Sequence, residues 1–208
     1  MKAQELIKAI TAGELNNTLK ELYGAENVAT QAMRYTKAIN EFIKIYGDID
    51  CNIFSVPGRS ELSGNHTDHN HGEVLAGSIN LDIIAIASKT DDGVIRIKSK
   101  GFDEDCIDTN TYTEPNEKDF FKSGALIAGM AKAFTNAGYN KGGYIAYTTS
   151  NVFKGPLPQT SQNLSSYCNY SLSINQQYYV HPLLYHQVSF LPHHLKSISV
   201  LLLALTAL

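Results

Sequence analysis

The chain has 208 residues, 43% of them apolar, which is enough to bury a sizeable hydrophobic core. The formal net charge is −3 and no dense cluster of Lys and Arg occurs, so nucleic acid is not an expected partner. The first residues do not form a secretory signal, and the apolar stretch Val200–Leu208 is far shorter than the ~20 residues of a membrane helix. Three widely spaced cysteines fit neither a disulfide framework nor paired zinc ligands. We therefore expect a globular cytoplasmic protein.

Apolar residues recur at helical spacing in the first part of the chain. They predict helical structure over residues 4–23, with a break at Gly13 and a stop at Gly24. A second helical segment is predicted over residues 25–46 and should end at Gly47. The chain is therefore expected to open with two or three helices.

Strands and one further helix are predicted after Gly47. A short strand over residues 52–56 should stop at Pro57, and two more strands are expected on either side of a turn at Asp91–Gly93. Those two strands are predicted over residues 79–88 and 94–98. A further strand is predicted over residues 143–150 and an amphipathic helix over residues 117–137. This order of elements predicts an α+β fold with a mixed sheet.

The most polar stretch between apolar runs is Val56–Leu75, which contains glycines, histidines, one arginine and one aspartate. Arg59 offers a fixed cation with a planar set of donors, and His66 and Asp68 can hydrogen-bond hydroxyl groups. This set favours a binding loop for a polyol. Two alternatives remain open, a solvated turn without chemistry and a metal site. The metal ligands would be His66, Asp68, His69 and His71, whose spacing differs from that of helical zinc motifs.

The segment from Gly58 to Leu75 closely resembles the galactokinase signature, which runs Gly-Arg, a spacer, Gly-Glu-His-Thr-Asp, Gly and Val-Leu. The resemblance extends with lower specificity from about Met33 to Gly155. It implies an N-terminal domain of the GHMP kinase type, with the fold called ribosomal protein S5 domain 2-like. It also implies a cytoplasmic enzyme that uses ATP and Mg²⁺ to phosphorylate galactose at the anomeric hydroxyl.

The resemblance also implies roles for individual residues. The equivalent of Arg59 lies by the transferring phosphoryl group and the sugar C1 hydroxyl, which makes Arg59 the candidate catalytic residue. The equivalents of His66 and Asp68 bind galactose hydroxyls. Asn65 stands where the usual signature has glutamate and is a further candidate sugar ligand whose amide both donates and accepts. No resident metal ligand is implied within the chain.

The ATP-binding part of the family pattern is not recognisable. A glycine-rich phosphate loop should begin at Gly155, the candidate cofactor-binding residue, but the chain continues with Pro156, which has no amide hydrogen to offer. No Asp or Glu follows Lys154, so the family's catalytic aspartate has no counterpart. We therefore predict little or no kinase turnover by these 208 residues.

Composition changes after Gly155, because Lys196 is the single charged residue beyond that point. We predict a galactokinase-like domain over residues 1–155 and an atypical tail over residues 156–208 that is not a native domain. Truncation or a reading-frame error would explain this tail, and a genuine tail rich in His and Tyr is the alternative. We expect the tail to be poorly packed and prone to association.

Two other functions remain open at this point. Some galactokinase-like proteins are sugar-binding sensors that regulate transcription, although such proteins typically keep the phosphate loop. Asn65 leaves open a related sugar kinase, such as one for N-acetylgalactosamine. The expected ligand is galactose or a similar monosaccharide, and no protein or membrane partner is indicated.

Overall fold

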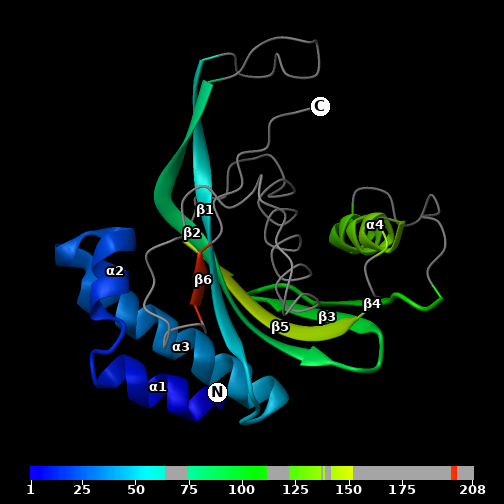
Figure 1. The fold of residues 1–208 in the computed structure, drawn as a ribbon, viewed down its shortest axis with the longest axis horizontal. Coiled ribbons are helices and arrows are strands. Elements are labelled where there is room, and N and C mark those ends of the chain that lie inside the picture. Colours follow the sequence, from blue (N-terminus) through cyan, green and yellow to red (C-terminus); the bar gives the residue numbers. More distant parts are fainter. Residues whose placement is uncertain (64–74, 112–121, 137, 139–141, 152–197, 201–208) are drawn as a thin grey trace.

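A computed structural model describes residues 1–63, 75–111, 122–136, 138, 142–151 and 198–200 of the chain. These residues form one six-stranded sheet with helices packed against it, which confirms the predicted α+β class. The strand order is β4-β3-β5-β2-β1-β6. In Figure 1, α1, α2 and α3 lie together on one side of the sheet, and α4 lies near β3 and β4 away from those three helices.

The opening helices match the predicted segments closely. They are α1 (Ala3–Thr11), α2 (Asn16–Tyr23), the short 3-10 turn η1 (Ala25–Asn27) and α3 (Val28–Tyr46). Gly24 and Gly47 follow α2 and α3 with φ angles of 86° and 87°, a backbone conformation that glycine adopts without strain. The buried residues Leu6, Ala9 and Ile10 show why α1 forms here, because this spacing places them on one helical face.

Strand β1 (Asn52–Ser63) does not stop at Pro57, so that prediction was wrong. It pairs in antiparallel fashion with β2 (Leu75–Thr90), which is also longer than the predicted 79–88. An irregularity in the pairing lies between Pro57 and Arg59. The regular ladder of backbone hydrogen bonds is interrupted at such a site. A proline is therefore tolerated there, although it has no N–H to donate to the partner strand.

The turn at Asp91–Gly93 does not join neighbouring strands, contrary to the hairpin expected there. Strand β5 (Gly143–Ser150) lies between β2 and β3 (Val94–Ser99), antiparallel to β2 and parallel to β3. Gly143 begins β5 beside this turn. A Cβ atom at that position would lie 2.5 Å from Thr90 Oγ1 and 2.7 Å from the Val94 backbone nitrogen. Glycine is therefore needed where the inserted strand enters.

Two strands were missed at the edges of the sheet. Strand β4 (Glu104–Asp108) pairs with β3, and β6 (Ile198–Val200) pairs in parallel with β1. The three residues of β6 come from the segment predicted as an atypical tail. Helix α4 (Ser123–Asn136) begins later than predicted, because Lys122 forms a bend, and it ends before Gly138 as expected.

Apolar residues alternate between the two faces of the sheet and build a core on each. Ile53, Ile84 and Ile86 face α1, α2 and α3, whereas Phe54 and Ala85 belong to the cluster that includes α4. The sheet is thus fixed from both sides, and β1 and β2 extend together well beyond the helices (Figure 1). Within the described residues, no helix has the length and apolar character to cross a bilayer.

Candidate functional site

The predicted sugar-site residues fall at and beyond the far end of the β1–β2 pair. The backbone of Arg59 lies in β1 opposite Ser78 of β2. Asn65, His66 and Asp68 lie outside the described residues, as does the predicted cofactor residue Gly155. These three residues lie in the segment 64–74, which joins the end of β1 to the start of β2 along the chain.

The pairing of β1 and β2 changes register just before Arg59. Pro57 pairs with Asp82, but the next pair along β1 is Arg59 with Ser78. One residue of β1, the buried Gly58, therefore stands opposite three residues of β2. An irregularity of this kind bends a strand pair and changes the direction of the residues that follow. We call the part of β1 and β2 beyond it, residues 59–63 and 75–78, the ribbon.

A buried polar cluster lies at this irregularity, with Asp82 at its centre. The Arg34 guanidinium donates from Nη1 to Asp82 Oδ1 at 2.6 Å. The hydroxyls of Tyr23 and Ser55 both donate to the other carboxylate oxygen, Oδ2, at 2.5 Å. The Tyr35 hydroxyl lies 2.7 Å from that of Tyr23. Asp82 is 2% exposed, so these side chains from α2, α3 and β1 satisfy its charge in place of water.

The backbone of Asp82 is held as well as its side chain. Arg34 Nη2 donates to the Asp82 carbonyl oxygen at 3.1 Å, and its Nη1 also donates to Gln31 Oε1. The backbone N–H of Asp82 donates to Asn151 Oδ1 at 2.7 Å. The backbone N–H of Asn151 donates back to the Asp82 backbone carbonyl oxygen at 3.2 Å. Asn151 directly follows β5, in the direction of Gly155. The position of β2 at Asp82 is therefore fixed from both α3 and the end of β5.

The two tyrosines act as neutral hydroxyl groups. Burial, the charge of Asp82 and the neighbouring Tyr35 raise the pKa of Tyr23 far above its ordinary value. Burial and the Asp82 charge raise the pKa of Tyr35 to about 12. Loss of a proton would place a second negative charge next to the carboxylate. These hydroxyls therefore stay protonated, and Tyr23 remains a hydrogen-bond donor to Asp82.

The burial of Asp82 decides what the cluster can do chemically. A carboxylate that is 2% exposed and already accepts three side-chain hydrogen bonds has no access to a substrate. The cluster can orient the strands but does not itself offer a sugar-binding or proton-transfer group. Sequence reasoning did not assign a role to Asp82. The available signal was a single charged residue inside the mostly apolar strand segment predicted over residues 79–88.

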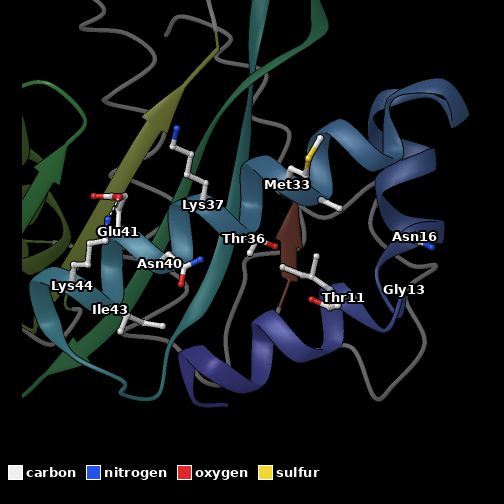
Figure 2. Close-up of a pocket in the computed structure, with 12 residues that line it drawn as sticks. Thr11, Gly13, Asn16, Met33, Thr36, Lys37, Asn40, Glu41, Ile43 and Lys44 are labelled. Carbon is white, nitrogen blue, oxygen red and sulfur yellow. Dashed lines mark hydrogen bonds and ion pairs between the residues drawn. The ribbon is translucent and has the colours of Figure 1, made fainter.

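An open groove lies elsewhere, between α1 and α3 (Figure 2), with a volume of about 910 Å³. Figure 2 shows Thr11 on α1 and Thr36 and Asn40 on α3 among its lining residues. Lys44 forms an ion pair with Glu41 at 2.6 Å on the same helix. The described residues that line this groove come from α1, from α3 and from positions 13 and 16.

The described residues include no recognisable site for ATP and Mg²⁺. Nowhere in the described parts do three His, Cys, Asp or Glu side chains gather so that they could hold a metal ion. The predicted phosphate-loop position at Gly155 lies outside those parts, and the sequence beyond it has Pro156 and Pro158. The alternative metal ligands His69 and His71 also lie outside the described residues.

Comparison with known proteins matches this region of the chain to one family signature. The model described as "Galactokinase galactose-binding signature" matches residues 40–89, which include β1, the loop and nearly all of β2. The signature is that of the galactokinases. It ends at Lys89, one residue before the end of β2, so the match takes in Asp82 as well as Arg59.

Sequence relatives and a solved structure agree with the galactokinase signature. Galactokinase from Enterococcus faecalis is 32% identical over 93 residues, or 42% of this chain and 24% of the relative. Galactokinase from Streptomyces coelicolor is 30% identical over 114 residues, or 55% of this chain and 29% of the relative. The chain thus spans about a quarter to a third of these two relatives.

The fold is similar to that of part of a solved galactokinase structure. The crystal structure of Lactococcus lactis galactokinase complexed with galactose matches 68% of this chain and 37% of that protein, with a TM-score of 0.57. The sequence identity in this match is 21%, so the likeness concerns the fold.

Proposed function

We propose that this chain is the galactose-binding part of a galactokinase. The supporting observation is the match of the galactose-binding signature to residues 40–89, which contain the whole β1–β2 pair apart from one terminal residue of β2. In this proposal the ribbon presents Arg59 toward the anomeric hydroxyl of the sugar. Asn65, His66 and Asp68 bind the other hydroxyls through donors and acceptors suited to a polyol.

The intact enzyme would transfer the γ-phosphate of MgATP to the anomeric hydroxyl of galactose in the cytoplasm. ATP and Mg²⁺ would provide the phosphoryl group and neutralise its charge during transfer. Within this chain, Arg59 would stabilise negative charge near the attacking oxygen, because its guanidinium stays charged at all relevant pH values. Substrate positioning and electrostatic stabilisation account for most of such catalysis.

The first experiment measures sugar binding. Isothermal titration calorimetry of the purified chain should detect galactose binding and no comparable binding of glucose. N-acetylgalactosamine belongs in the same panel, because Asn65 alters the usual signature. Asp68→Ala should weaken galactose binding at least tenfold. His69→Ala is the matched control in the same loop and should leave the affinity within twofold. A chain that is folded by circular dichroism but binds no sugar would overturn the proposal.

The second experiment measures phosphoryl transfer. We propose that residues 1–155 form the galactokinase-like domain and that residues 156–208 result from truncation or a reading-frame error. ADP release with galactose should therefore be negligible, because proline replaces amide donors at the phosphate-loop position. The nucleotide sequence past codon 155 should encode a Ser-rich loop and a later Met-Asp-Gln segment in another frame. Ordinary kinase rates, with contaminating kinase excluded, would contradict this view of the tail.

A further inference from the structure

Asp82 connects the part of the sheet that is packed on both faces with the ribbon that extends beyond it. On its packed side, β2 continues through Ile83 and Ile84 into the core. On its other side, β2 runs through three residues that stand opposite Gly58 and then pairs Ser78 with Arg59. Asp82 is thus the last residue of β2 to pair with β1 before the register changes.

The side-chain partners of Asp82 come from three different elements. Tyr23 belongs to α2, Arg34 to α3 and Ser55 to β1, and each donates to the carboxylate. A carboxylate can accept from all three donors at once, whereas an amide has one acceptor oxygen and a donor group. Aspartate is therefore the side chain that can join the three elements at this position.

We propose that Asp82, held by Arg34, is a positioning residue for the sugar site. It fixes the place where the β1–β2 ribbon leaves the sheet and so fixes the backbone position of Arg59. This inference rests on the proposed function, because it assigns Asp82 an effect on the galactose site. Asp82 itself touches no substrate.

The pairing of β1 and β2 around the irregularity explains why loss of the Asp82 charge should affect the ribbon before other parts of the sheet. Two pairs hold β1 and β2 together around the irregularity, Pro57 with Asp82 and Arg59 with Ser78. The first pair is reinforced by the cluster and by Asn151, which exchanges two hydrogen bonds with the Asp82 backbone. Strand β3 and the middle of β5 have their own apolar contacts through Ile97 and Ala146. Only the far end of β5 reaches the cluster, where Arg34 Nη2 donates to the Thr149 carbonyl oxygen at 3.5 Å.

The test compares Asp82→Asn with Asp92→Asn in the sugar-free chain. Asp92 is a matched control because it also accepts an arginine hydrogen bond, at 2.7 Å, but lies at the exposed turn. Hydrogen exchange measured by mass spectrometry should accelerate at least tenfold for peptides from residues 59–63 and 75–78 in Asp82→Asn. Exchange in β3, which has no contact with the cluster among the described residues, should change less than twofold, and Asp92→Asn should leave the ribbon unchanged.

A milder variant covers the case in which Asp82→Asn does not fold. Ser55→Ala removes one hydroxyl donor to Asp82 and leaves the Arg34 ion pair in place. It should accelerate exchange in the ribbon about threefold. Unchanged ribbon exchange in Ser55→Ala and Asp82→Asn would overturn the proposal. An equal acceleration in every strand would also overturn it, because that result indicates a general loss of stability.

Galactose titration then separates this inference from the proposed function. At a temperature where all variants are folded by circular dichroism, Asp82→Asn should raise the dissociation constant for galactose at least tenfold, and Asp92→Asn less than twofold. If Asp82→Asn frees the ribbon but binds galactose as tightly as the unaltered chain, the effect on the sugar site is refuted. If the unaltered chain does not bind galactose, the proposed function fails, and this inference fails as a statement about a sugar site.

Discussion

Two arginine–aspartate ion pairs of almost equal length lie in different parts of the molecule. Arg34 and Asp82 are 2.6 Å apart, with side chains 16% and 3% exposed. Arg96 and Asp92 are 2.7 Å apart, with side chains 33% and 45% exposed. The first pair lies between α3 and the sheet, and the second lies at the turn between β2 and β3. Their contact distances are nearly identical, but their surroundings are not.

The partners of each aspartate explain why the two pairs should differ in energy. The Asp92 carboxylate accepts from Thr90, Val94 and Arg96, all within four positions along the chain. Asp82 accepts from Arg34, which is 48 positions away in sequence, and from two buried hydroxyls. Water can replace a lost partner at the exposed turn but not in the buried cluster. Contact distance alone therefore does not rank the two pairs.

The largest expected effect comes from removing one arginine at a time. Arg34→Met leaves the buried Asp82 charge without its cation and should lower the free energy of unfolding by about 3 kcal/mol. Arg96→Met should cause no measurable loss, because Asp92 is open to solvent. Urea denaturation followed by circular dichroism measures both variants. Equal losses would remove the distinction between the buried and the exposed pair.

The second-largest expected effect is a loss of stability at high pH, caused by the buried tyrosines. The pKa of Tyr35 is raised to about 12, whereas an unfolded tyrosine has a value of 10.0. The unfolded chain therefore releases this proton first, and stability present below pH 10 is lost as pH rises toward 12. The loss at pH 12 should be about 2 kcal/mol for this group. Unfolding titrations should show a smaller loss in a Tyr23→Phe, Tyr35→Phe double variant, and an identical loss would contradict this assignment.

Two tyrosine–carboxylate hydrogen bonds, one buried and one near the surface, should differ in the same direction by a smaller amount of free energy. Tyr23 donates to Asp82 in the buried cluster, and Tyr46 donates to Glu104 at 2.6 Å near the surface. Tyr23→Phe should lower the free energy of unfolding by about 1.5 kcal/mol. Tyr46→Phe should have less than half that effect, because water can replace its hydroxyl at Glu104. Thermal and urea unfolding of the two variants would show whether this order holds.

The smallest effect belongs to the exposed pair at low pH. The Val94 amide, with Arg96 and Thr90, lowers the pKa of Asp92 to about 2 from its ordinary value of 3.8. Its contribution to stability is present above pH 3.8 and is lost as pH falls toward 2. NMR titration of the Asp92 carboxyl carbon measures this value directly. Arg96→Gln should move it upward by less than one unit, because the Val94 amide remains.

The elements of the fold were largely predictable from local pattern, but their arrangement was not. Apolar spacing and the glycines at 24 and 47 predicted the ends of α2 and α3, and the strand at 143–150 was predicted with its observed bounds. The position of β5 between β2 and β3 depends on contacts distant in sequence, which periodicity does not contain. Pro57 was read as a stop because the irregularity that accommodates it involves its partner strand.

The signature motif of the candidate site could be predicted from the sequence, but the buried cluster around Asp82 could not. The galactokinase signature was recognised from consecutive residues, and the family match includes them. The Asp82 cluster joins residues from four separate elements, so no local pattern could reveal it. The sugar-site roles of Arg59, Asn65, His66 and Asp68 remain predictions.

The insertion of β5 also affects the order in which the sheet can form during synthesis. When residues up to 99 have left the ribosome, β1 and β2 can pair and pack against the three helices, but β3 has no partner in that sheet. Strand β4 can pair with one edge of β3, and the other edge stays open until residues 143–150 follow. At typical translation rates this interval lasts on the order of seconds. Chaperones should therefore bind the nascent chain most strongly in that interval, with the edge that contains Ile95 and Ile97 as the exposed apolar segment.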